Sequence, residues 1–291
     1  MRIFHSLALA VASVLALAGS ARAADLRPQS KLLLTGGVSN VEGAGGGGLA
    51  SWATTTGYGA AQGVGANLHA TGAKLDDYEL RSWGAAAGLF DRVEVSYARQ
   101  AFDTGKTGAL LGIGKGFTFH QDIWGAKAVL VGDAIYDQDR LLPQIAVGVQ
   151  HKNNDRDGLV AALGARSDKG TDYYLAATEL LLAQSLLING TVRSTAANQF
   201  GLLGFGGPNG GRSTQVEGSV AWLASKRLAF GAEYRSKPDN LAFARENDAV
   251  DVFAAYALNK NLSVTAAYVD LGDIATFKNQ RGLYLSLQAG F

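Results

Sequence analysis

Most of the chain alternates between apolar and polar residues with a period of two, the pattern of β-strands whose two faces differ. In the segment 92–98, Val93, Val95 and Tyr97 share one side, and charged or hydroxyl residues occupy the other. The segments 215–222, 227–235, 250–258 and 262–268 repeat this pattern. We therefore expect an all-β protein built from many strands of similar length.

The polar face of these strands is unusual for a water-soluble β-protein. It consists mainly of Gly, Ser, Thr, Ala and Asn with occasional charges, whereas a soluble sandwich usually shows Lys and Glu. Several of the apolar rows end in an aromatic residue, as expected for the girdles of aromatic side chains at the two membrane interfaces of a barrel. These residues are Tyr97, Trp124, Trp222, Tyr234, Tyr256 and Tyr268. The pattern predicts a single transmembrane antiparallel up-and-down β-barrel, with a soluble sandwich or solenoid as the alternative.

The connections between predicted strands alternate between short and long, as the two ends of a membrane barrel require. Only the connection 134–142 is longer than a periplasmic turn should be. Fourteen strands are predicted, at 31–39, 47–56, 61–71, 78–89, 91–102, 122–133, 143–152, 171–182, 185–197, 214–224, 226–236, 248–258, 261–271 and 281–291. The first two are the weakest, because residues 43–48 are nearly all glycine. The alternative is twelve strands with a plugging or extended N-terminal segment.

The N-terminus has the features of a secretory signal peptide. Arg2 precedes an apolar stretch at 7–17, and Ala21-Arg22-Ala23 forms an A-x-A cleavage pattern. We expect residues 1–23 to be removed and residues 24–291 to form the barrel. An uncleaved anchor helix is the alternative, but the stretch is shorter than the ~20 residues that a helical span needs. No later segment is apolar enough to cross a bilayer as a helix.

Composition and charge exclude several classes of function. The chain contains no Cys, which rules out disulfides, thiol catalysis and Cys-ligated metals. Its 26 Lys and Arg against 25 Asp and Glu give a net charge of +1, so no electrostatic argument favours nucleic acid. Removing Arg2 and Arg22 with the signal peptide would leave 24 basic against 25 acidic residues, or −1.

The C-terminal strand carries a specific signal. Counting back in twos from the last residue gives an unbroken apolar row, formed by Leu283, Leu285, Leu287, Ala289 and Phe291. Here the sequence resembles Gram-negative outer-membrane β-barrel proteins, whose last strand ends in an aromatic residue after alternating apolar positions. The resemblance implies an outer-membrane location, contact with lipid, and recognition of this strand by the barrel-assembly machinery.

Five further segments are similar to an uncharacterised family of proteobacterial outer-membrane proteins, a domain of unknown function. They lie at 32–38, 90–94, 137–143, 201–207 and 233–240. The similarity extends over nearly all of the mature chain. It implies no established activity, so no functional residue is assigned from it.

Motifs for nucleotide or metal chemistry are incomplete. The Gly-Lys-Thr triplet at 105–107 lacks the glycine five residues before it that a phosphate-binding loop needs, since that position is Gln100. The acids at 133, 137, 139, 155 and 157 lack the spacing of a calcium loop with its closing Glu. We expect no nucleotide, no metal and no cofactor.

The three histidines of the mature chain do not form an evident catalytic pair. His69 is expected to face the lumen, His120 to lie in a loop, and His151 to end a strand near the rim. A barrel lipase needs a hydroxyl–histidine pair on the lipid-facing wall. The sequence shows no such pair at a suitable depth, so we expect no enzyme.

Charged residues on the polar face are the candidates for lining the lumen. They are Arg92, Glu94, Lys127, Arg193, Glu217, Glu233, Arg235 and Asp251. Both signs are present, which is compatible with two arrangements: a pore whose charges tune selectivity, or a salt-bridged network that seals the lumen. The glycine run 43–48 and the apolar loop 200–207 either fold inward as constrictions or are simply flexible.

The leading functional hypothesis is a passive outer-membrane channel or uptake porin for small hydrophilic solutes. The second is a non-conducting structural or interaction barrel that binds polysaccharide or a partner through its outer loops. A lipid-modifying barrel enzyme is the third. The sequence identifies neither the solute nor the oligomeric state.

Overall fold

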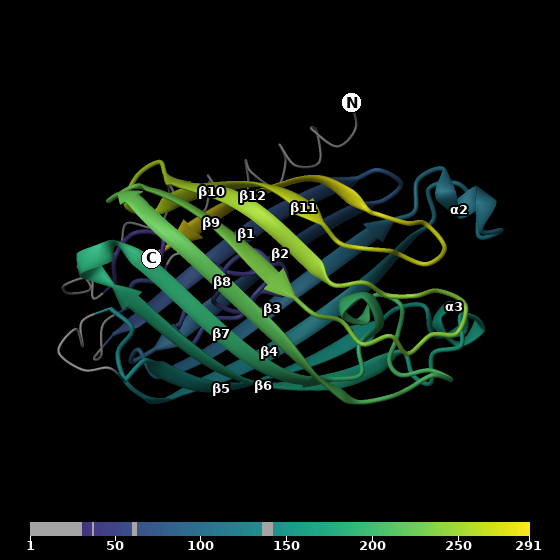
Figure 1. The fold of residues 1–291 in the computed structure, drawn as a ribbon, viewed down its shortest axis with the longest axis horizontal. Helices are drawn as coiled ribbons and strands as arrows, with labels where there is room; N and C mark the ends of the chain where they lie inside the picture. Colours follow the sequence, from purple (N-terminus) through teal and green to yellow (C-terminus); the bar gives the residue numbers. More distant parts are fainter. Residues whose placement is uncertain (1–30, 37, 60–62, 136–141) are drawn as a thin grey trace.

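The computed structural model describes residues 31–36, 38–59, 63–135 and 142–291. In this part of the chain, twelve antiparallel strands form one closed barrel, in which each strand pairs with its sequence neighbours and β1 pairs with β12 (Figure 1). The expected signal peptide, 1–23, lies outside the described residues. Among the described residues, no helix combines the length and the apolar character needed to cross a bilayer.

The strands are 8 to 14 residues long. Their bounds are β1 Val64–Leu75, β2 Glu79–Leu89, β3 Val93–Asp103, β4 Thr118–Val131, β5 Gln144–Asn154, β6 Lys169–Leu181, β7 Leu186–Thr195, β8 Ser213–Ser225, β9 Leu228–Arg235, β10 Ala249–Ala257, β11 Leu262–Asp270 and β12 Arg281–Gly290. Each matches one of the last twelve predicted strands to within four residues at either end.

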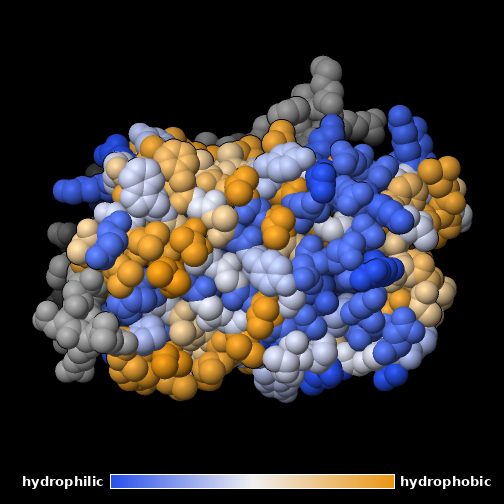
Figure 2. Space-filling view, viewed as in Figure 1, coloured by the Kyte–Doolittle hydropathy of each residue, from blue (hydrophilic) through white to orange (hydrophobic). Residues whose placement is uncertain are grey.

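The outer wall carries the predicted apolar rows. Val252, Tyr268 and Leu283 keep more than half of their surface exposed. Their inward neighbours Asp251, Val269 and Tyr284 are buried. On the visible face in Figure 2, apolar side chains gather mainly toward the left of the barrel, and hydrophilic ones cover much of the right half. A closed barrel leaves no unpaired strand edge, so apolar side chains on this wall can face lipid.

The two ends of the barrel differ. At one end, here called the turn end, strands are joined mainly by short turns such as 90–92, 226–227 and 258–261. At the other, the long-loop end, connections of up to 17 residues carry the short helices α2 (Thr107–Leu110), α3 (Asp157–Ala162) and η2 (Asn198–Gly201). The turn after β6 contains η1 (Leu182–Gln184). By the usual rule, the turn end is periplasmic and the long-loop end is external.

The prediction of fourteen strands was wrong, and the twelve-strand alternative is confirmed. The segments 31–39 and 47–56 form no strand of the barrel; among their described residues, only isolated bridges occur. Residues 31–36 and 38–59, here called the plug, instead lie inside the barrel, and most of their side chains are buried. Apolar plug residues such as Leu34 and Trp52 contact the inner wall, so the apolar character that suggested strands here comes from packing inside the lumen.

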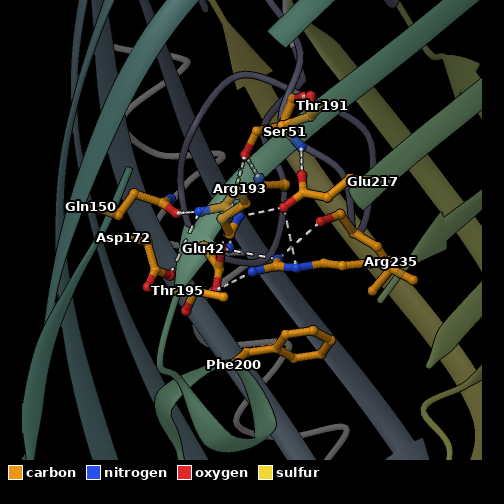
Figure 3. Close-up of polar contacts among 12 residues, drawn as sticks. Glu42, Ser51, Gln150, Asp172, Thr191, Arg193, Thr195, Phe200, Glu217 and Arg235 are labelled. Atoms are coloured by element: carbon orange, nitrogen blue, oxygen red, sulfur yellow. Dashed lines mark hydrogen bonds and ion pairs between the residues drawn. The ribbon is translucent and has the colours of Figure 1, made fainter. Parts of the chain in front are cut away.

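The barrel interior is layered along its axis. At the turn end, Leu34 and Trp52 of the plug pack against small inward residues such as Ala221 and Ala255. At the long-loop end, Phe102 and other aromatic residues form a larger apolar cluster. Charged and hydroxyl side chains lie between these clusters, around the apex of the plug (Figure 3).

Candidate functional site

The centre of the polar layer is Glu42, at the apex of the plug. Its carboxylate is fully buried and forms ion pairs with Lys152 of β5 and Arg235 of β9. The Glu42 Oε2 atom lies 3.0 Å from Arg235 Nη1, and Oε1 accepts a 3.1 Å hydrogen bond from Nη2. One plug residue is therefore tied to two strands of the wall (Figure 3).

A second set of charges surrounds this contact. Arg193 of β7 donates to Glu217 of β8 and lies 3.7 Å from Asp172 of β6. Asp172 lies 2.8 Å from Lys152 Nζ, and Arg235 Nε lies 3.4 Å from Glu217. The three acids Glu42, Asp172 and Glu217 thus balance the three bases, and all six side chains are at most 3% exposed.

This balance depends on the plug. Without Glu42, the wall would keep three cations against two carboxylates in a buried layer. Removing one partner of a buried ion pair costs about 3–5 kcal/mol, because the remaining charge loses its compensation. The network therefore favours the docked plug.

A second polar clamp holds the returning arm of the plug. Lys127 Nζ of β4 donates to the backbone carbonyls of Gly45 (3.0 Å) and Thr54 (2.8 Å), and it pairs with Glu94 of β3. Glu94 accepts hydrogen bonds from the backbone N–H groups of Gly45 and Thr56. Buried backbone groups need such partners, since the plug makes no ladder with the strands.

The glycine run of the plug is explained by close approach to wall carboxylates. A Cβ on Gly47 would overlap the carboxylate of Glu233, and one on Gly48 would lie 3.2 Å from Glu233 and 3.3 Å from Asp251. Glu233 and Asp251 are register partners on β9 and β10. Glu233 also accepts a 2.7 Å hydrogen bond from the N–H of Leu49. Glycine lets the plug backbone lie directly against the wall.

The loop between β7 and β8 folds into the lumen from the long-loop end. Phe200, which is buried, lies with its ring 4.3 Å below the guanidinium carbon of Arg235. Its carbonyl accepts hydrogen bonds from Lys152 Nζ (3.0 Å) and Gln121 Nε2 (3.3 Å). The same cations therefore hold the plug from one side and this loop from the other.

A buried pair in the loop between β9 and β10 holds the inward loop in place. The N–H of Gln199 donates to the Glu246 carboxylate (2.9 Å), and Lys237 Nζ donates to Gln199 Oε1 (3.0 Å). Burial raises the pKa of Glu246 to about 7 despite the neighbouring Lys237. Burial also lowers the pKa of Lys237 to about 8, against the opposing effect of nearby acids. The loop contact is therefore sensitive to pH near neutrality.

A small cavity of about 30 Å³ lies in the turn-end half of the lumen. Plug residues such as Val38 and Trp52 line one side, and inward residues of β7 to β10, such as Leu187 and Phe253, line the other. Its lining is mostly apolar, in contrast with the charged layer around Glu42.

The structure brings seven of the eight residues predicted to line the lumen into the barrel interior. Those seven are buried: Glu94, Lys127, Arg193, Glu217, Glu233, Arg235 and Asp251. Arg92 differs, because it lies in the turn between β2 and β3, is exposed, and donates to the carbonyl of Gly132. The turn shifts it out of the alternation that placed it beside Glu94.

Three residues of the ionic network were not predicted. Lys152 and Asp172 have inward parity on β5 and β6, and each lies near the long-loop end of its strand. Strand parity counted from Gln150 and Tyr174 would have found them. Glu42 carries no such signal, since the plug has no regular period.

The histidines and the acidic residues have structural contacts. His69 is buried and lies 3.3 Å from the Ser82 hydroxyl. His120 belongs to β4 rather than to a loop, and its ring contacts Asp155 at 3.0 Å. Within the described ranges, no group of three or more His, Asp or Glu residues has the geometry of a metal site. Asp137 and Asp139 lie outside the described residues.

His151 has a contact that sequence reasoning missed. Its Nδ1 lies 3.0 Å from the hydroxyl of Thr171 on the neighbouring strand, and His151 is exposed. A hydroxyl nucleophile needs a histidine that a third group orients. Among the described residues, no carboxylate forms an ion pair or hydrogen bond with the His151 ring, so the pair lacks that third group.

The sequence matches one protein family over residues 35–288, described as a protein of unknown function, DUF3034. The chain belongs to this family. The match confirms the predicted resemblance to an uncharacterised family. Comparison with curated proteins gives no match.

Solved structures with a similar fold include outer-membrane porins. The KdgM porin in complex with disordered oligogalacturonate is 10% identical, with a TM-score of 0.52 over 77% of this chain and 99% of that one. The NanC porin is 10% identical, with a TM-score of 0.48 over 78% and 98%. Acinetobacter baumannii Omp33 is 9% identical, with a TM-score of 0.46 over 78% and 97%. The likeness to KdgM shows a shared porin-type barrel fold.

Proposed function

We propose that this chain is a passive channel of the Gram-negative outer membrane, closed at rest by residues 31–59. Barrels of about eight strands fill their interior with their own side chains, whereas those of about 16–18 strands leave an aqueous channel. Twelve strands enclose an intermediate space, and here the plug and the inward loop fill it. Conduction requires the plug to move.

The observation that carries this proposal is the chemistry of the plug–wall contact. Backbone N–H groups of Gly45, Leu49 and Ser51 donate to the wall carboxylates Glu94, Glu233 and Glu217. Water can replace each of these hydrogen bonds, and the exposed wall would then be a charged surface that remains compatible with a water-filled lumen. An apolar contact around the whole plug would give no such lining.

The charged middle layer supports passage of small hydrophilic solutes, the class that the sequence favoured. The inward charges would act on solutes of either sign without covalent chemistry. Transport in this proposal is diffusion, and it needs no cofactor.

Deletion of residues 31–59 tests the proposal. Purified wild-type protein in planar bilayers should show rare, small openings, whereas the deletion variant should conduct steadily. Heat-modifiable migration on a gel shows that the variant still forms a barrel. A folded deletion variant that never conducts would overturn the channel proposal.

A non-conducting structural barrel is the second candidate, favoured by the balanced charges around Glu42. Buried ion pairs with full compensation are also what a permanent seal requires. The two candidates differ in the deletion experiment, because a structural barrel should lose stability without gaining a regulated conductance. A wild-type protein that does not open at any voltage or with any solute would favour this second candidate.

A further inference from the structure

A pocket of about 130 Å³ lies among the long loops, at the opposite end of the barrel from the first cavity. Its walls come from loops and strand ends on both sides of the barrel mouth. Its lining includes Tyr78, Phe102, Leu111, Phe119, Leu203 and Phe243. An apolar cavity of about 150 Å³ is large enough to bind benzene, so this volume suits a small apolar guest with an aromatic ring.

Aromatic rings form one wall of this pocket. The ring centroids of Tyr78 and Phe102 are 5.0 Å apart, and those of Phe102 and Phe119 are 5.2 Å apart. All three side chains are buried, so the wall is fixed before any ligand arrives. Offset and tilted rings at these separations are favourable pairs, and they present apolar surface for an aromatic or aliphatic guest.

The pocket offers almost no polar recognition. No charged side chain is among its lining residues, and its two hydroxyls are already engaged within the protein. The Tyr78 hydroxyl donates to the Ile274 carbonyl (3.3 Å), and the Thr104 hydroxyl donates to the Phe117 carbonyl (2.8 Å). Water inside such a pocket lacks partners, whereas apolar molecules bind in cavities of this kind.

The pocket is accessible from the external end. Leu111 and Phe243 line it, and they keep 36% and 37% of their surface exposed. Apolar side chains also gather at the right edge of Figure 2, in the region where Figure 1 shows α2 and α3. Apolar residues with this exposure at a pocket entrance are a common feature of ligand sites.

The pocket also adjoins the closed lumen. Leu203 lines it and belongs to the inward loop whose Phe200 lies against Arg235. The apolar cluster around the pocket continues to Val41 and Leu49 of the plug. A molecule bound here would therefore contact elements that must move before the lumen opens.

We propose that the long-loop end holds a binding site for a small uncharged molecule that is mainly aromatic or aliphatic. The inference rests on the proposed function only where it treats this molecule as cargo. Binding itself requires the pocket and no movement of the plug. The substrate class would then include apolar compounds, beyond the hydrophilic solutes that the charged layer supports.

Two fluorescent probes with one ring framework test the site. 1-N-phenylnaphthylamine is uncharged, and 1-anilinonaphthalene-8-sulfonate adds a sulfonate. We expect saturable binding of the uncharged probe, with one site per barrel and at least about tenfold tighter than the sulfonate, because the pocket supplies no cation. Binding is measured on the full-length folded protein in one detergent, with probe partition into protein-free micelles subtracted.

Two leucine variants provide the matched controls. Leu111→Trp enlarges a side chain that lines the pocket, and it should weaken binding of the uncharged probe about tenfold or more. Leu110→Trp makes the same change at the preceding residue, which is 77% exposed and not part of the lining, and it should leave binding unchanged. Because both positions are exposed on one short helical turn, neither change should prevent folding.

Equal binding in the wild type and Leu111→Trp, or tighter binding of the sulfonate, would overturn the site. Probe binding with no conductance from the plug deletion would keep the site and overturn the transport role. Conductance of the plug deletion without probe binding would keep the channel proposal and overturn the site. The two proposals therefore fail separately.

Discussion

Glu42 and Arg235 lie 3.0 Å apart, although 193 positions separate them in the sequence. Glu42 is at the apex of the plug, and Arg235 is at the end of β9 beside the inward loop. Arg235 also lies over the Phe200 ring. The Arg235 guanidinium therefore contacts the plug and the inward loop at once, and it holds both against the wall.

Glu42→Gln should loosen the plug. The amide keeps the size of the side chain but leaves Lys152 and Arg235 without their shared anion, a loss of about 3–5 kcal/mol for a buried pair. We expect more frequent openings in planar bilayers, with the same single-channel amplitude as the rare wild-type events.

Glu79→Gln is the control for this change. Glu79 forms a 3.5 Å ion pair with Arg81 at the rim, where both side chains are partly exposed. Such pairs contribute about 0–1 kcal/mol, so opening frequency should remain that of the wild type. Equal effects of the two variants would contradict a specific role for Glu42.

Gly47→Ala should also displace the plug, through sterics rather than charge. The new methyl group would overlap the Glu233 carboxylate, so either the plug or the side chain must move. We expect faster proteolysis within residues 31–59 on the folded barrel. Gly190→Ala in β7 adds the same methyl group where no atom lies within 4 Å, and it should leave proteolysis unchanged.

The inward loop should be least stable between pH 7 and 8. The folded pKa of Glu246, about 7, exceeds its ordinary value of 4.5, so its contribution is full below pH 4.5 and is lost as pH rises to 7. The folded pKa of Lys237, about 8, is below its ordinary 10.5, so its contribution is present above pH 10.5 and is lost as pH falls to 8.

Hydrogen exchange at the Gln199 amide, corrected for the intrinsic pH dependence, measures this loop. Protection should fall from pH 4.5 to 7 in the wild type, and Glu246→Gln should remove that slope. A slope that survives Glu246→Gln would assign the titration to another group.

The outer wall should tolerate charge only near its ends. Val220, half exposed in the middle of β8, should lose about 2–4 kcal/mol of folding free energy on substitution by Arg. Leu258 has nearly the same exposure but follows β10 at the turn end, so Leu258→Arg should cost about 0–1 kcal/mol. Denaturant titration in lipid vesicles measures both, and equal costs would contradict a lipid-facing wall.

The barrel could be predicted from the sequence because its strands obey one local rule. Each inward position alternates with an outward one, so parity alone assigned Glu94, Lys127 and Arg193 to the interior. Leu283 and Leu285, the first two residues of the C-terminal apolar row, likewise face outward. Local periodicity predicts which face of the strand a residue occupies. The prediction is clear here because the face toward lipid must be apolar.

The contents of the lumen could not be predicted in the same way. Leu34 and Trp52 look like strand residues, but their partners are wall residues far away in sequence, such as Ala255 and Leu187. The glycine run offered two interpretations, and only its contact with Glu233 distinguishes them. Contacts between residues far apart in the sequence, with no regular spacing, leave no local pattern from which the plug could be predicted.

A disulfide between the plug and the wall tests the central claim most directly. The chain has no cysteine, and the Ser39 hydroxyl lies 3.1 Å from the Asn67 side chain on β1, so Ser39→Cys with Asn67→Cys introduces one cross-link. We predict that the oxidised protein is silent in planar bilayers and that reduction restores the wild-type openings. Openings of equal frequency in the oxidised and reduced protein would contradict a channel gated by residues 31–59.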